Sequence, residues 1–226
     1  MKVPRTTVNI ILIMVLSIFS MFIVEYYLVP GYIIKSILKI TMFFIVPLIY
    51  VGVDKSIDIL DYFKIYSRKQ IIGSIALGLS IYMLIMGAYF ILTTYIDLSQ
   101  IRKILYASRD INRNNFFFVA VYISILNSLL EEFFFRGFLF LSLNKVSTRA
   151  VAYLISALAF AAYHIGIMVD WRNGTISFLA IIALLTGGLV FNYLNEKNKN
   201  IYSSWLVHIS VNLALNTIGL MMYGFF

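Results

Sequence analysis

Seven long runs of apolar residues constrain this chain more than any other feature. A membrane-crossing helix needs about 20 apolar residues, because the hydrocarbon core is about 30 Å thick and an α-helix rises about 1.5 Å per residue. Runs of this length lie at roughly 8–29, 32–53, 71–96, 116–143, 150–168, 175–194 and 202–226. They predict an all-α fold, a polytopic transmembrane helix bundle with seven membrane helices. There would be eight if the run at 116–143 or the last run contains a break.

The composition agrees with a membrane protein. Hydrophobic residues make up 62% of the chain and charged residues only 12%, with a mean hydropathy of +0.92. Soluble domains are far more polar than this. The runs leave no room for a soluble domain, so residues 1–226 are predicted to form a single membrane domain. The chain has no cysteine, which excludes disulfides, thiol catalysis and acylation anchors.

The charge pattern favours lipids as partners and argues against nucleic acid. The net charge is +8, but the basic residues are scattered over short loops instead of forming one basic surface. Lys and Arg are more numerous in the loops that are cytoplasmic when the N-terminus is inside, which predicts that orientation. The basic segment 97–115 is an exception, which an amphipathic surface helix would explain. The short length, basic loops and Ile/Lys/Asn-rich composition suggest a multi-pass protein of a bacterial plasma membrane.

Three charged residues flank the turn at Pro30-Gly31: Glu25, Lys35 and Lys39. A carboxylate on one helix can pair with an ammonium on the next, and lysines near a helix end can extend toward the interface. We therefore expect a structural role for these three. Further along, Ser74 and Gly78 have the spacing of a small-xxx-small motif and predict close helix packing.

The stretch LLEEFFFRGF places three ionisable residues in an apolar run. On a helix Glu132 and Arg136 are neighbours one turn apart and can form an ion pair. Glu131 is then left over. Because an unpaired carboxylate at membrane depth costs at least a few kcal/mol, Glu131 must be protonated, face a wet cavity or have another partner. A purely structural ion-pair network remains an alternative for this triplet.

The only two histidines, His164 and His208, both lie inside predicted spans. Phe160 precedes His164 by one helical turn, so its ring can pack beside the imidazole. Asn212 follows His208 by four residues, so both project from one helical face. The two carboxylates and the guanidinium of this triplet, the two imidazoles and the amide make chemical sense if they converge on a hydrated cavity.

Three motifs occur in a fixed order: Glu131-Glu132-x-x-x-Arg136, Phe160-x-x-x-His164 and His208-x-x-x-Asn212. In this order, and inside apolar helices, they resemble the CPBP (Abi) family of intramembrane proteases, which includes CAAX prenyl endopeptidases and bacteriocin-associated proteins. The resemblance covers about residues 116–215, the motif-bearing core.

The resemblance implies hydrolysis of a peptide bond within the membrane. Glu131, helped by His164, would activate a water, and His208 with Asn212 would stabilise the oxyanion. Glu132 and Arg136 would form the ion pair that orients Glu131, and a direct share of Glu132 in proton transfer stays open. The substrate would be a peptide or (lipo)protein. The reaction would be either CAAX-type cleavage or the processing of a bacteriocin or signal peptide.

The sequence leaves alternatives open for the metal dependence of the proposed protease and for the overall role of the protein. Glu131, His164 and His208 could bind Zn with an open position for water. The chain has no H-E-x-x-H motif, however, and its histidines come from separate helices, so a metal-free glutamate protease is slightly favoured over a metalloprotease. A second hypothesis is a non-catalytic bacteriocin immunity or membrane scaffold protein. A third is a proton-coupled transporter that uses intramembrane Glu, Arg and His as a relay.

Overall fold

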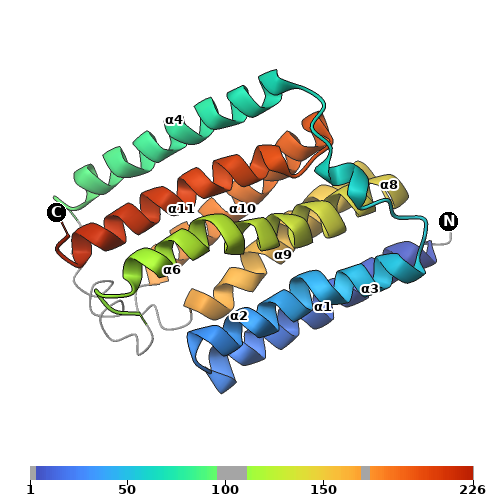
Figure 1. The fold of residues 1–226 in the computed structure, drawn as a ribbon, viewed down its shortest axis with the longest axis horizontal. Coiled ribbons are helices and arrows are strands. Elements are labelled where there is room, and N and C mark those ends of the chain that lie inside the picture. The colour runs from blue at the N-terminus through green and yellow to red at the C-terminus, as the bar shows by residue number, and fades with distance from the viewer. Residues whose placement is uncertain (1–3, 96–110, 169–173, 226) are drawn as a thin grey trace. The chain divides into compact units, whose positions relative to one another are not determined.

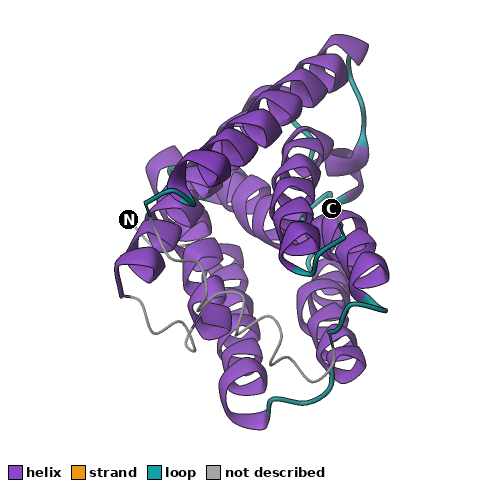
Figure 2. Ribbon diagram, turned by 90° about the vertical axis from the view of Figure 1, so that its left-hand side faces the viewer, coloured by secondary structure: helices purple, strands orange, loops and turns teal. Residues whose placement is uncertain are grey.

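A computed structural model describes residues 4–95, 111–168 and 174–225, and these residues form helices without any strand (Figure 2). Seven helices in these ranges are long and apolar enough to cross a membrane: Arg5–Leu28, Tyr32–Val53, Arg68–Leu92, Phe116–Val146, Arg149–Gly166, Ile176–Asn198 and Tyr202–Met222. The predicted all-α class and the seven spans are confirmed. The runs at 116–143 and 202–226 each contain one candidate span and no second one. Most of the surface helix predicted at 97–115 lies outside the described residues.

The chain divides into two compact units. The first comprises residues Met1–Tyr66 and Leu130–Tyr202, and the second comprises Ser67–Leu129 and Ser203–Phe226. Each unit therefore combines segments that are distant in the sequence. The single membrane domain over residues 1–226 stays a prediction.

The first unit holds most of the helices. Its N-terminal part contains α1 (Arg5–Ile23), the π-helix η1 (Val24–Leu28), α2 (Tyr32–Ile40), the π-helix η2 (Thr41–Ile45), α3 (Val46–Val53) and the 3₁₀-helix η3 (Leu60–Phe63) (Figure 1). Its later part contains the π-helix η5 (Glu132–Leu141), α8 (Ser142–Val146), α9 (Arg149–Met168) and α10 (Gly174–Asn198). The short α7 (Ser128–Glu131) leads into η5.

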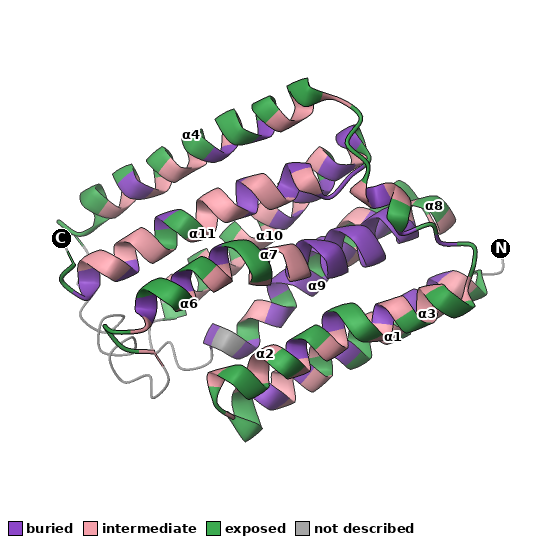
Figure 3. Ribbon diagram, viewed as in Figure 1, coloured by how far each residue is buried: buried purple, intermediate pink, exposed green. Residues whose placement is uncertain are grey.

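The core of the first unit is built around η5, in which every residue is buried (Figure 3). The segment EFFFRGFLFL is apolar on almost all sides, which is typical of a helix surrounded by protein. It packs against α9, α10, α1 and η2. Phe43 of η2 stacks on Phe134 with ring centroids 4.3 Å apart and meets Phe135 edge-on at 5.4 Å. These aromatic contacts bring α2 and η2 close to the acidic stretch.

An N-terminal helical hairpin brings two of the expected charged residues together. The helix α1–η1 ends at Val29, which adopts the left-handed conformation with φ of 38°. After the turn, Lys35 of α2 donates a hydrogen bond of 2.7 Å to Glu25 of η1. The expected pair between neighbouring helices is thus confirmed for Glu25 and Lys35, but Lys39 has a different carboxylate partner, which belongs to the candidate site.

The second unit contains α4 (Arg68–Leu92), α6 (Phe116–Tyr122), the π-helix η4 (Ile123–Asn127) and α11 (Tyr202–Met222). A Cβ added at Gly78 of α4 would lie 3.1 Å from the Cβ of Ser210 on α11. The close packing predicted from Ser74 and Gly78 is therefore present at Gly78. On the other side of α11, the ring of Phe116 packs against Gly219.

Candidate functional site

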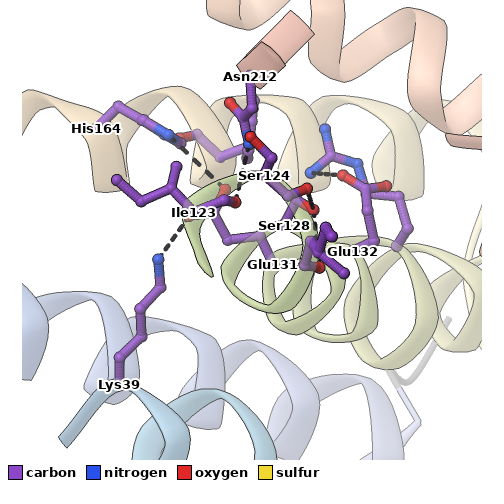
Figure 4. A network of polar contacts seen from close by, with 11 residues as sticks. Lys39, Ile123, Ser124, Ser128, Glu131, Glu132, His164 and Asn212 are labelled. Carbon is purple, nitrogen blue, oxygen red and sulfur yellow. Dashed lines mark hydrogen bonds and ion pairs between the residues drawn. The ribbon is translucent and has the colours of Figure 1, made fainter. Parts of the chain in front are cut away.

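Glu131 lies at the end of α7 and has a charged partner inside the protein. Its side chain is 4% exposed, and the Nζ of Lys39 lies 2.5 Å from its Oε1 (Figure 4). Lys39 extends from α2 and is also buried. Of the three outcomes that the sequence allowed for Glu131, the structure therefore shows another partner, and this partner comes from the first three helices, which carry none of the motifs.

His164 of α9 faces the other oxygen of the same carboxylate. Its Nε2 lies 3.9 Å from Oε2 of Glu131. This distance is too long for a direct hydrogen bond, and a polar separation of this size is one at which a bridging water must be considered. Glu131 thus presents Oε1 to an ammonium and Oε2 to an imidazole, and it lies between the two groups.

The backbone of α9 sets the orientation of the His164 ring. Its Nδ1 lies 2.8 Å from the carbonyl oxygen of Phe160, one turn earlier on the helix. A carbonyl only accepts hydrogen bonds, so Nδ1 carries the proton in this contact. In a neutral imidazole the Nε2 is then an acceptor, and it is the nitrogen that faces Glu131. The Phe160 ring packs edge-on against the imidazole at 4.6 Å, as the sequence predicted.

The ion pair predicted between Glu132 and Arg136 is confirmed, and both side chains are fully buried. Nη1 of Arg136 lies 3.5 Å from Oε1 of Glu132, and no guanidinium nitrogen has a hydrogen-bond partner among the residues that the structure describes. Aromatic rings surround the guanidinium instead, with its Cζ 4.0 Å from the Phe160 ring centroid and 5.0 Å from that of Phe191. Desolvated cation–π contacts of this kind are worth about 2 kcal/mol or more.

These contacts connect the ion pair of Glu132 and Arg136 to His164. Arg136 lies against Phe160, and Phe160 holds His164 through both its ring and its carbonyl. The family resemblance implied that the pair of Glu132 and Arg136 orients Glu131, and this role stays a prediction. The geometry adds a connection to His164 through an aromatic ring.

The second unit positions the other two predicted site residues. His208 on α11 is 6% exposed, and the amide of Asn212 donates a hydrogen bond of 3.2 Å to the carbonyl of Ile123 in η4. Farther along α11, the Asn216 amide donates to the carbonyl of Ala120 and to the Ser124 hydroxyl. Polar side chains thus join α11 to α6 and η4. The convergence of His208 and Asn212 with Glu131 stays a prediction.

The donors around Glu131 do not fit a zinc ion well. The described residues contain no group of three or more His, Asp or Glu side chains that could hold a metal. At Glu131 itself, Oε1 is taken by the Lys39 ammonium, whose positive charge would repel a cation at that oxygen. The site that the structure shows is a hydrogen-bonded ion pair with an adjacent imidazole.

A separate apolar groove of about 450 Å³ lies between α1 and α9. It is lined by Met14, Val15, Ile18, Phe19, Phe22, Ile155, Leu158, Ala159 and Ala162. The lining residues of α9 recur every three or four positions and so share one face, while Phe160 and His164 lie on another. The groove is therefore not the cavity that would hold a water beside Glu131.

Sequence reasoning missed Lys39 as a site residue. Lys35 and Lys39 are one turn apart on the same helix, and nothing local distinguishes the lysine that meets Glu25 from the one that meets Glu131. One signal was available: an excess carboxylate and an excess ammonium, both inside apolar runs, should find each other, because each is costly alone.

Comparison with protein families places these motifs in a known context. Residues 113–214 match the family model described as type II CAAX prenyl endopeptidase, Rce1-like, and the match includes all three motifs. No curated protein and no solved structure matches the chain at a significant level. Residues 113–214 of this chain thus match an Rce1-like domain, a type of domain found in the CPBP family of intramembrane proteases.

Proposed function

We propose that this protein is an intramembrane endopeptidase in which Glu131 and His164 activate a water for attack on a peptide bond. One observation carries the proposal: Oε2 of Glu131 and Nε2 of His164 face each other across 3.9 Å. Their other polar atoms are engaged elsewhere, by Lys39 and by the Phe160 carbonyl. Both groups are thus oriented before any substrate arrives, which is what general-base catalysis requires.

The geometry suggests how the protons move. A water between the two groups can donate one hydrogen bond to the carboxylate and one to Nε2, both of which accept. As its oxygen bonds to the scissile carbonyl carbon, its proton passes to Glu131 or His164. When the carbon–nitrogen bond breaks, the same proton goes to the leaving amine, so that the site returns to its starting state.

The developing oxyanion needs hydrogen-bond donors in a site shielded from bulk water. We assign this role to His208 and Asn212, which lie one turn apart on α11. An amide carries two N–H groups, so the bond from Asn212 to Ile123 does not by itself use both. Glu132 and Arg136 would support the site through Phe160.

We further propose a metal-free glutamate mechanism. The Lys39 ammonium on Oε1 supports it, because this cation already supplies the positive charge that a metal would bring to the carboxylate. Activity should then survive incubation with a strong chelator and dialysis. Loss of activity that returns with added Zn²⁺ alone would overturn this part of the proposal.

The substrate proposal is broader. The matched family is named for CAAX prenyl endopeptidases, and the net charge of +8 favours an anionic bilayer. We propose a peptide or lipoprotein substrate cut at the plasma membrane of a bacterium, by CAAX-type cleavage or by processing of a bacteriocin or signal peptide. A panel containing a prenylated CAAX peptide, its unprenylated form and a leader peptide would separate these classes.

The central test measures cleavage of this panel by purified protein in liposomes. Glu131→Gln and His164→Ala should each lower kcat by about 100- to 10,000-fold, the range that general acid–base catalysis contributes. His208→Ala should lower it as well, because it removes an oxyanion donor.

A matched control is available in the same chain. Glu25→Gln removes another carboxylate that pairs with a lysine of α2. The carboxylate that faces His164 is that of Glu131, which this variant leaves in place. This variant should keep wild-type cleavage. Equal losses in Glu25→Gln and Glu131→Gln, or wild-type cleavage by Glu131→Gln, would refute the proposed function.

A further inference from the structure

The lysine at Glu131 is an unusual group to bury. An ammonium is strongly hydrated, and removing it from water costs several kcal/mol unless a partner compensates. Lys39 is nevertheless buried, with 6% of the whole residue exposed. Its Nζ lies 2.5 Å from Oε1 of Glu131 and 4.8 Å from the centroid of the Tyr163 ring. The surroundings therefore stabilise a cation at this position.

The neighbouring lysine shows that this contact is specific. Lys35 lies one turn before Lys39 on α2 and pairs with Glu25. The Lys35 side chain is 25% exposed, whereas that of Lys39 is 8% exposed. The same helix thus forms one partly hydrated ion pair at its beginning and one nearly dry ion pair deeper in the protein. Only the deeper pair includes a residue of the candidate site.

The ammonium has two physical effects on Glu131. Its charge favours the carboxylate over the neutral acid in a place with little water, and a base must be a carboxylate to accept a proton. Its hydrogen bond also fixes the rotation of the carboxyl group. With Oε1 held by Lys39, Oε2 points to His164 (Figure 4).

We propose that Lys39 is a positioning residue for Glu131, which it keeps ionised and turns toward His164. The proposal rests on the proposed function, since it assigns how the base of that reaction is prepared. Lys39 holds Oε1 of Glu131, whereas the proposed water binds at the other oxygen, Oε2. Its contribution should therefore appear in kcat, with KM nearly unchanged.

The first arm of the test compares Lys39→Met with Lys35→Met in peptide cleavage. Lys39→Met should lower kcat by about 100-fold, the loss expected when a catalytic group is misplaced by about 1 Å. Lys35→Met should cleave like the wild type. Lys39→Arg restores a cation and should recover part of the loss. Wild-type kcat in Lys39→Met would overturn the proposal.

The second arm reads the ionisation of Glu131 directly and needs no substrate. Infrared spectra of protein with ¹³C-labelled glutamate, with Glu131→Gln subtracted, isolate the bands of this carboxyl. At neutral pH the wild type and Lys35→Met should show a carboxylate, and Lys39→Met should show a protonated acid. A carboxylate in Lys39→Met would refute the role of Lys39, whereas an inactive wild type with the expected spectra would refute only the proposed function.

A folding defect in Lys39→Met would not leave the question open. Removing one partner of a buried ion pair is far more damaging than replacing both with neutral groups. The double variant Lys39→Met/Glu131→Gln should then insert and fold better than Lys39→Met alone. Equal misfolding of the two variants would show that Lys39 serves the packing of α2 instead of Glu131, and would overturn the proposal.

Discussion

Arg136→Met removes the cation from the centre of the first unit and leaves the Glu132 carboxylate fully buried in an aromatic shell. Both side chains of the pair have no solvent exposure. Breaking a buried pair by removing one partner costs about 3–5 kcal/mol. The lost stacking on Phe160 adds to this, since a desolvated cation–π contact is worth about 2 kcal/mol. We therefore expect Arg136→Met to lower the free energy of unfolding by at least about 3 kcal/mol.

The decisive quantity is the coupling free energy between Arg136 and Glu132 in a double-mutant cycle. Glu132→Gln alone should also destabilise, because it leaves the guanidinium buried without this carboxylate. In the double variant Arg136→Met/Glu132→Gln neither charge remains, so its loss should be smaller than the sum of the single losses by about 2–3 kcal/mol. Unfolding in mixed micelles by increasing SDS, followed by circular dichroism, gives the four free energies of the cycle.

The chain contains a matched surface pair for comparison. Arg149 contacts Glu196 through two hydrogen bonds of 2.7 and 2.8 Å, shorter than the 3.5 Å of the buried pair, but its side chain is 66% exposed. Water screens such pairs, so their coupling is small. A cycle with Arg149→Met and Glu196→Gln should show much weaker coupling. Additive losses in the buried cycle, or equal coupling in the two cycles, would refute the reasoning from burial.

Two further predictions concern helix packing and acid sensitivity. Gly78→Leu should destabilise the second unit by about 1–3 kcal/mol through overpacking against Ser210. Gly73→Leu on the same helix should not, because a Cβ added at Gly73 meets no atom of another described segment within 4 Å; SDS unfolding of both variants checks this. Hydrogen bonds, chiefly from Ser56, hold the pKa of the Asp54 carboxyl below its usual range. The stabilisation from Asp54 is then present at neutral pH and is lost on acidification below about pH 4. Asp54→Asn should remove this part of the acid sensitivity in thermal melts recorded across pH, and an unchanged pH profile would contradict the assignment.

The spans were predictable because membrane insertion depends on local composition. The run at 32–53 matches the helix Tyr32–Val53 at both ends, and the remaining spans differ by a few residues at their ends. Where a helix is longer than the predicted run, polar or charged residues continue it beyond its apolar part. In Phe116–Val146, for instance, the helix extends past the apolar run to Lys145 and Val146.

Contacts within one turn were also predictable. The pair of Glu132 with Arg136 and the ring of Phe160 beside His164 follow from the helical repeat, and both occur. The partner of Glu131 was not predictable in this way. Lys39 is 92 residues away in the sequence, and its approach depends on Phe43 packing against the phenylalanines of η5.

The sequence by itself determined the membrane class, seven of the possible spans, the three motifs and the family that these motifs resemble. These depend on residue type and on spacing along one helix, which are local properties. Only the tertiary structure decided that Lys39 pairs with Glu131 while Lys35 pairs with Glu25. It also decided that the guanidinium of Arg136 lies against the rings of Phe160 and Phe191. The physical reason is that a buried charge is stabilised by whichever opposite charge the packing brings within a few ångströms, and packing depends on the whole unit.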